Sequence, residues 1–121
     1  MRVETMQPSA HDRLLGLVSH LPHVVAYALI AAIEGERVGG RDPLAYSGGG
    51  LRDTSRIASS HPAMWRDIFL DNRSEVLRAI DGFRVELDRL RDSIEREDPA
   101  ELEAALARSR NARTRLKDPR S

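Results

Sequence analysis

The chain has 121 residues, of which 19 are basic and 19 acidic, so its formal net charge at pH 7 is zero. This length suits one domain with its own core and is short for two. A balanced charge gives no global field that would attract nucleic acid or an anionic membrane. Because cysteine is absent, disulfides and thiolate metal sites are excluded. Few aromatic residues and abundant Ala, Leu, Arg and Glu favour helix over sheet.

The first long helix is expected from about Ser9 to Glu34, with a stop near Gly35. Its apolar residues cover most of the circumference, which is typical of a central helix surrounded by others. The longest apolar stretch, Val24–Ile33, is about half of a membrane span, and no signal peptide is readable before it. We therefore expect no membrane association, and the composition is compatible with the cytoplasm.

Three polar residues interrupt this apolar helix. Ser19 lies four residues and His20 three residues before His23, which places all three close together on the helix surface. Pro22 removes one backbone hydrogen bond and is expected to kink the axis. The histidines are either satisfied core residues or the lining of a polar notch that binds a substrate. A metal site is not expected, because the other two histidines have no evident reason to converge on this pair.

A loop over Gly35–Tyr46 leads to three successive glycines and a short helix over Leu51–Ser59. Glycines let a backbone approach a ligand closely, and a turn before a helix leaves N–H donors for an anion. Arg52 and Arg56 are four residues apart, so both should project from one face and could bind a carboxylate. The alternative is a flexible loop with solvated arginines, in which Asp53 simply pairs with Arg56.

The next helix is expected to start at Ser60 as N-cap, with Pro62 in its first turn and the only tryptophan, Trp65, after it. It should loosen near Asp71–Asn72. Beyond that point apolar residues alternate four and three apart, which is typical of a coiled-coil-like seam packed within the chain. The seam consists of Val76, Ile80, Phe83, Leu87, Leu90 and Ile94.

A last helix should cover this seam. Asp98 is its expected N-cap, Pro99 its first residue, and Glu101 lies in its first turn. The Arg-rich tail over residues 107–121 is expected to fray rather than to bind nucleic acid. These patterns predict an all-α fold, a bundle of about five helices forming a single domain over residues 1–121.

The motif SHLPH, followed by GGG-x-RD-x-x-RIA and then W-RDI, resembles the C-terminal helical domain of prephenate dehydrogenases, the enzymes of tyrosine biosynthesis. The resemblance runs from about Arg2 to Leu116 and implies the fold of the C-terminal domain of 6-phosphogluconate-dehydrogenase-like enzymes. In that family an N-terminal Rossmann domain holds NAD or NADP, and the helical domain closes the substrate site and forms most of the homodimer interface. Prephenate is oxidised by hydride transfer with loss of CO2 to 4-hydroxyphenylpyruvate, and some members use arogenate instead.

The resemblance also implies what this chain lacks. It contains no GxGxxG motif after a strand, and the family's proton-accepting histidine lies in the N-terminal domain. We therefore expect a substrate-binding and dimerisation domain that binds no NAD or NADP and is inactive alone. Its implied partners are prephenate or arogenate, a second copy, and the parent's Rossmann domain. The alternative is a non-catalytic helical module that dimerises or senses an aromatic metabolite.

The family pattern transfers to individual residues of this sequence. The candidate substrate-binding residues are Ser19, His20, His23, Gly49, Arg52, Arg56 and Trp65. By resemblance, Arg56 meets a carboxylate of prephenate, which a guanidinium fork binds better than Lys would. Gly49 would offer a backbone contact and Trp65 a nearby wall. Asp53, together with His11, would support Arg56. No catalytic residue and no metal ligand is expected in the chain.

Overall fold

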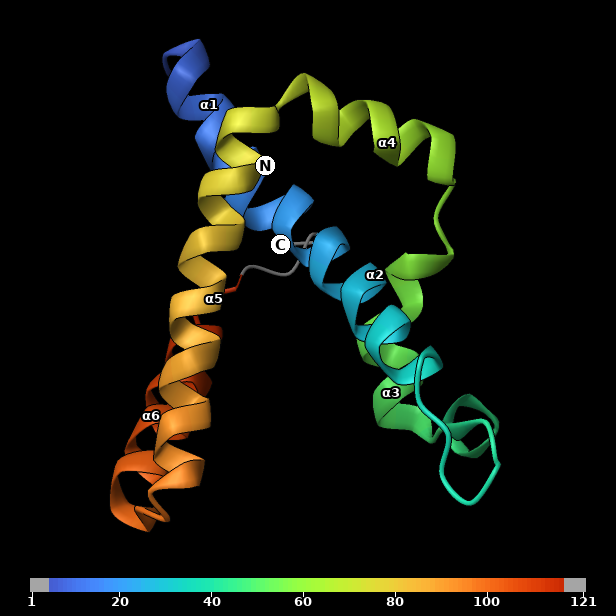
Figure 1. Cartoon of the computed structure of the whole chain (residues 1–121). Helices are drawn as coiled ribbons and strands as arrows, with labels where there is room; N and C mark the ends of the chain where they lie inside the picture. Colours follow the sequence, from blue (N-terminus) through green and yellow to red (C-terminus); the bar gives the residue numbers. More distant parts are fainter. Residues whose placement is uncertain (1–4, 117–121) are drawn as a thin grey trace. The chain divides into compact units, whose positions relative to one another are not determined.

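The computed structural model describes residues 5–116 (Figure 1). Its regular elements in that range are helical, apart from one isolated β-bridge between Val38 and Arg41. The predicted all-α class is thus confirmed. The elements are α1 (Pro8–Leu15), η1 (Gly16–His20), α2 (Leu21–Glu34), η2 (Pro43–Tyr46), α3 (Gly49–Ser55), η3 (Arg56–Ser59), α4 (Pro62–Asp71), α5 (Arg73–Glu95) and α6 (Pro99–Arg113). They fall into two compact units, one built on residues 6–80 and the other on residues from 81 onward.

The expected first helix is present with nearly the predicted ends, but it is not regular. α1, η1 and α2 follow one another without a break, and η1 is a π-helical turn in which the Leu21 N–H donates to the Gly16 carbonyl, five residues back. Pro22 comes directly after it and has no N–H to donate to the preceding turn. A kink is expected at Pro22, and the structure has a π-helical turn, wider than an α-helical one, just before it.

The prediction that other helices surround this one is wrong for the chain by itself. In α2 only Ala26 is fully buried, whereas Leu14, Leu17 and Val18 before it are exposed. α3 and η3 pack against α2, and elements this short cannot cover its whole circumference. By length and hydropathy the run Pro8–Glu34 would suffice to cross a membrane, a property that core helices of soluble proteins share.

α1 and η1 meet the first turns of α5 at a very close approach. A Cβ on Gly16 would lie 3.3 Å from the Cβ and 3.3 Å from the carbonyl oxygen of Glu75. Val76 and Ala79, which follow on α5, are buried core residues. These distances are tighter than ordinary van der Waals contact, so a side chain at position 16 would require Glu75 to shift.

The start and end of α4 are fixed by contacts with earlier helices. His61, not Ser60, is the N-cap, with Pro62 at the first helical position. The Ser60 carbonyl instead accepts a 3.0 Å hydrogen bond from the hydroxyl of Tyr27 on α2. The predicted loosening is confirmed as a true break, since α4 ends at Asp71 and α5 begins at Arg73. Asn72 lies between the two helices in a non-helical conformation, with φ −112° and ψ 34°.

In the second unit, α5 and α6 are joined by a well-capped turn. Asp98 is the N-cap as predicted, and its Oδ1 accepts from the Glu101 N–H at 3.0 Å. The Glu101 carboxylate receives both an ion pair from Arg96 and a hydrogen bond from the hydroxyl of Ser93, which is buried. The Asp98 cap satisfies the Glu101 N–H in the first turn of α6, and the contacts of the Glu101 carboxylate join that turn to the end of α5.

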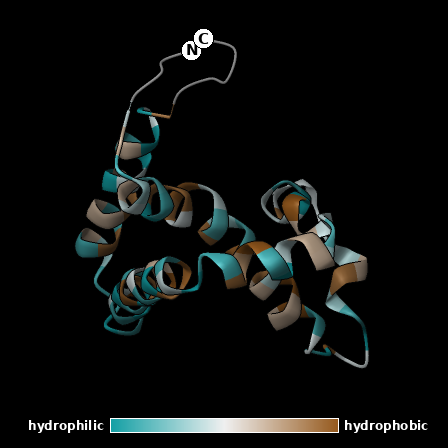
Figure 2. Ribbon diagram, turned by 90° about the horizontal axis from the view of Figure 1, so that it is seen from above, coloured by the Kyte–Doolittle hydropathy of each residue, from teal (hydrophilic) through white to brown (hydrophobic). Residues whose placement is uncertain are grey.

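The expectation that α6 covers the apolar seam is only partly met. Leu90 of α5 and Leu102 of α6 are half-buried, whereas Phe83, Leu87 and Ile94 remain exposed. Figure 2 shows hydrophobic residues recurring along the helical ribbons among hydrophilic ones. Part of the seam is therefore left without a partner in the described part of the chain.

Gly16 in η1 and Gly82 in α5 allow a matched test of the close approach. A Cβ added at Gly82 would meet nothing within 4 Å, so Gly82→Ala should raise the free energy of unfolding by roughly 0.5–1 kcal/mol. Gly16→Ala gains the same propensity but meets the backbone of Glu75, and it should lower stability by about 1–3 kcal/mol. Urea unfolding of both variants measures the difference. Equal stabilisation by the two substitutions would contradict the close packing at Gly16.

Candidate functional site

Three of the predicted site side chains form one cluster in the first unit. The His23 imidazole stacks on the Trp65 indole, with ring centroids 3.4 Å apart and an interplanar angle of 17°. His20 meets the same indole edge-on, at 6.1 Å and 78°. His20 and Trp65 are each only 8% exposed. Residues of α4 thus close over the polar face of the first helix, as the notch hypothesis requires.

Ser19 contributes to this cluster through its backbone. Its carbonyl oxygen lies 2.9 Å from Nδ1 of His23. A carbonyl can only accept, so His23 carries a proton on Nδ1, and in the tautomer with this single proton Nε2 is an acceptor. The stack on Trp65 fixes the position of the imidazole, and the hydrogen bond to the Ser19 carbonyl fixes a proton on Nδ1.

Asn72 belongs to the same cluster and was missed by the sequence analysis. Its side-chain amide lies 2.8 Å from the carbonyl oxygen of Asp12 and 3.2 Å from Nδ1 of His20. These contacts join the break between α4 and α5 to α1 and η1, which come far earlier in the sequence. The one available signal was an asparagine at the expected helix break, since Asn commonly occupies such positions.

Burial shifts the protonation equilibrium of His20. It lowers the pKa of the imidazole below its ordinary value of 6.5, and the neighbouring His23 lowers it further. The carboxylate of Asp12 acts in the opposite direction but is the smallest of the three effects. The neutral ring is therefore favoured at pH 7.

The glycine and arginine candidates lie elsewhere in this unit, on α3 and η3. Gly49 begins α3 and has open space beside it, so its backbone is accessible. Arg52 lies on α3, but Arg56 begins η3 after the helix ends at Ser55, so the expected single helical face is not formed. Both guanidinium groups are exposed. α3 and η3 pack on α2, which carries His23, yet no hydrogen bond joins them to the histidine cluster within residues 5–116.

The supporting residues are not joined to Arg56 in this structure. Asp53 is exposed on α3, and His11 is exposed on α1. Among the described side chains, no hydrogen bond or ion pair links Asp53 to Arg56 or to His11. In the same range no group of three or more His, Cys, Asp or Glu side chains is arranged to hold a metal ion.

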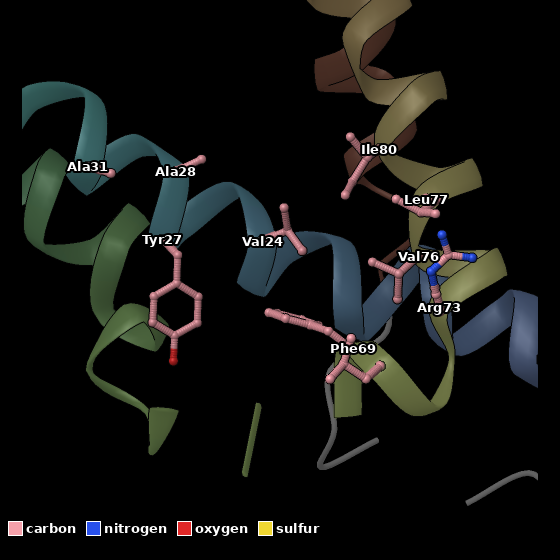
Figure 3. Close-up of a pocket in the computed structure, with 10 residues that line it drawn as sticks. Val24, Tyr27, Ala28, Ala31, Phe69, Arg73, Val76, Leu77 and Ile80 are labelled. Carbon is pink, nitrogen blue, oxygen red and sulfur yellow. The ribbon is translucent and has the colours of Figure 1, made fainter. Parts of the chain in front are cut away.

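An apolar cavity of about 570 Å³ adjoins the histidine cluster. Figure 3 shows its walls, with Val24 and Ala28 on α2 facing the first turns of α5, and Phe69 on α4 between them. Phe69 also packs against Trp65, at a centroid distance of 5.6 Å. Arg73 is its only charged lining residue in the described part of the chain. The sequence analysis did not predict this cavity, because its lining comes from three helices.

The arrangement supports binding rather than bond-breaking chemistry. It offers an aromatic wall, the imidazoles of His20 and His23, and exposed guanidinium groups on a neighbouring element. Aromatic walls with a few fixed polar groups are typical of small-molecule sites. None of these groups by itself accepts a hydride.

Comparison with known proteins gives a family match over most of the chain. Residues 7–108 match the family "Prephenate dehydrogenase, dimerization domain". A cyclohexadienyl dehydrogenase of Zymomonas mobilis is 40% identical over 117 residues, which are 96% of this chain and 40% of that protein. A prephenate dehydrogenase of Bacillus subtilis is 40% identical over 99 residues, covering 80% of this chain and 26% of that protein.

Comparison with solved structures finds similar folds in prephenate and arogenate dehydrogenases. A crystal structure of prephenate dehydrogenase from A. aeolicus in complex with hydroxyphenyl propionate and NAD+ superimposes with a TM-score of 0.88 at 43% identity, covering 96% of this chain and 41% of that one. A Synechocystis arogenate dehydrogenase also gives 0.88, at 30% identity, covering 94% of this chain and 42% of that one. The present chain thus spans about two fifths of the length of these relatives.

The lowered pKa of His20 predicts how stability depends on pH. The unfolded chain binds a proton to this histidine more readily than the folded chain does, so the stabilisation is present above pH 6.5 and is lost as the pH falls through the folded-state pKa. Urea unfolding between about pH 7.5 and about pH 5.5 should show this loss. His20→Gln should reduce the loss, while the exposed control His61→Gln should leave it unchanged. An identical pH dependence in wild type and His20→Gln would contradict the assignment.

Proposed function

The chain belongs to the family of prephenate dehydrogenase dimerization domains, and from this membership we propose that it is the substrate-binding and dimerisation part of an NAD(P)-dependent prephenate dehydrogenase. The intact enzyme would convert prephenate to 4-hydroxyphenylpyruvate by oxidative decarboxylation. NAD or NADP, bound by the part of the enzyme outside this chain, would accept the hydride. This chain by itself would be inactive.

The observation that carries the proposal is the packing of His23 and His20 against Trp65. It brings residues of two distant sequence motifs into one cluster. Prephenate combines a six-membered ring with two carboxylates and a hydroxyl. An indole wall suits the ring, and neutral imidazoles suit hydroxyl or carboxylate oxygens. Enclosing such a cluster excludes water and strengthens each polar contact.

Arg56 and Arg52 would supply the positive charge that a dicarboxylate requires. Both are exposed on α3 and η3, which pack on the helix that carries His23. A guanidinium binds a carboxylate through two parallel hydrogen bonds, which fixes orientation as well as charge. Of the two, the family pattern assigns the carboxylate contact to Arg56, and Arg52 would add a second cation nearby.

We assign the homodimer interface to the uncovered seam of α5 in the second unit. Phe83, Leu87 and Ile94 repeat with the four-and-three spacing of a coiled coil and are exposed in the single chain. Monomeric proteins rarely leave such a continuous apolar stripe in water. A second copy would cover it with the same stripe, as a two-fold interface requires.

Calorimetric titration of the chain with prephenate and with 4-hydroxyphenylpyruvate tests the binding function. Binding should be weakened strongly by Arg56→Ala, by about 2–5 kcal/mol if the ligand desolvates the guanidinium. The control is Arg108→Ala, which removes an equally exposed arginine from α6 in the other unit.

Two results would count against the binding proposal. Equal weakening by Arg56→Ala and Arg108→Ala would indicate non-specific charge attraction. Absence of binding by the wild-type chain would mean that the site requires the cofactor domain, or that the chain serves dimerisation alone. Titration with arogenate in parallel identifies which of the two substrates the site prefers.

The interface is tested by a charge placed on the seam. Leu87→Glu should convert a dimer to a monomer in analytical ultracentrifugation, because burying an unpaired carboxylate costs several kcal/mol. Val85→Glu is the matched control, since Val85 is 50% and Leu87 53% exposed on the same helix but Val85 lies off the seam. Dissociation by Val85→Glu, or a dimer that survives Leu87→Glu, would place the interface elsewhere.

A further inference from the structure

The side chain of Asn72 has a defined orientation, although amide oxygen and nitrogen are similar in shape. One side of the amide lies 2.8 Å from the carbonyl oxygen of Asp12. Because a carbonyl can only accept a hydrogen bond, the NH2 group of Asn72 must face it. The same nitrogen lies 3.2 Å from Nδ1 of His20. Its second hydrogen is therefore available to this ring nitrogen.

This orientation decides the tautomer of His20. Nδ1 faces a donor, so it must be the unprotonated nitrogen of the neutral ring, and the proton lies on Nε2. His23 has the opposite arrangement, with the proton on Nδ1, which donates to the Ser19 carbonyl. The two neighbouring histidines are thus held in opposite tautomers. The Ser19 carbonyl, an acceptor, fixes His23, and the Asn72 amide, a donor, fixes His20.

Nε2 of His20 is neither hydrogen-bonded nor fully buried in the described part of the chain. Among residues 5–116 it has no hydrogen-bond partner. In that range only one fully buried side-chain N or O atom lacks a partner, and that atom is Oε2 of Glu75, not Nε2 of His20. The Nε2–H group is therefore not sealed inside the core, although His20 as a whole is only 8% exposed. It is an unused donor at the edge of the cluster formed with His23 and Trp65.

We propose that Asn72 is a positioning residue, which holds His20 in the Nε2–H tautomer so that His20 and His23 present one N–H donor and one nitrogen acceptor to the bound ligand. The identity of the ligand, a hydroxylated cyclic dicarboxylate, rests on the function proposed above. The donor fits a carboxylate oxygen, which can only accept. The acceptor fits a hydroxyl, which can donate. If His20 also carried its proton on Nδ1, both rings would present a bare Nε2, and neither could donate to a carboxylate.

The position of Asn72 suits this role. It lies in the break between α4 and α5, with Asp12 of α1 on one side of its amide and His20 of η1 on the other. The helix that carries Trp65 ends at this residue. The same side chain thus fixes the end of the aromatic wall and the proton position on the adjacent imidazole.

The tautomer is measured directly by two-bond ¹H–¹⁵N correlation spectra of the imidazoles in the 121-residue chain at neutral pH. In the wild type, His20 should show a protonated Nε2 and a bare Nδ1, and His23 the reverse. Observation of His20 protonated on Nδ1 would overturn the proposal without any substitution. This measurement needs neither ligand nor catalytic activity.

Asn72→Asp reverses the hydrogen-bonding role at nearly constant shape. A carboxylate accepts only, so it should move the His20 proton to Nδ1 or convert the ring to imidazolium. Asn111→Asp is the matched control, because Asn111 is exposed on α6 and should leave the spectrum unchanged. Asn72→Ala, which removes the donor without adding charge, should give a mixture of tautomers. An unchanged His20 tautomer in both folded Asn72 variants would overturn the proposal.

The consequence for the ligand is tested separately in the intact dehydrogenase. Asn72→Asp should raise KM for prephenate about tenfold or more, the effect expected for losing one hydrogen bond to a charged group. An unaltered KM in a variant with the tautomer reversed would contradict the positioning role. If the enzyme does not act on prephenate at all, the proposed function fails, while the spectra still decide whether Asn72 sets the tautomer.

Discussion

The stack of His23 on Trp65 is the contact on which the rest of the site depends. It joins the first helix to α4 at a ring separation of 3.4 Å, and it leaves His20 enclosed by the edge of the same indole. The enclosure lowers the pKa of His20, which keeps the ring neutral and allows a defined tautomer. Without the indole, both histidines would be ordinary solvated side chains on an irregular helix. The polar interruption of an apolar helix is therefore stabilised by a residue from a distant part of the sequence.

The same helix explains why so much apolar surface remains uncovered. Its sequence is apolar nearly all round, but the elements that pack on it in this chain are short, and Leu17 and Val18 stay exposed. The seam on α5 is likewise open at Leu87. A chain of two fifths the length of its relatives would be expected to leave such surfaces, since the relatives have further parts that can cover them. The exposed apolar area is consistent with a family named for dimerisation.

Much of the architecture follows from local sequence signals. Asp98 and Pro99 start a helix because the Asp98 side chain accepts a hydrogen bond from a first-turn N–H, and Pro99 has no N–H that needs a partner. The break at Asn72 follows from residues that favour turns. The SHLPH motif predicts that the two histidines lie close together on one helix. The π-helical turn before Pro22, the His61 cap and the contact of Asn72 with His20 were not predictable in this way. Each depends on packing between segments that are far apart in the sequence, and local sequence patterns carry no information about such packing.

The division of the candidate site between buried and exposed groups bears on how it would work. His20 and Trp65 are already enclosed in the single chain, whereas Arg52 and Arg56 remain in water. A solvated guanidinium attracts a carboxylate weakly, because water screens the charge and competes for the same hydrogen bonds. Its contribution grows only when something covers it, either the ligand or another part of the protein. The aromatic and imidazole half of the candidate site is therefore preorganised in the single chain, whereas the cationic half gains strength only when it is covered.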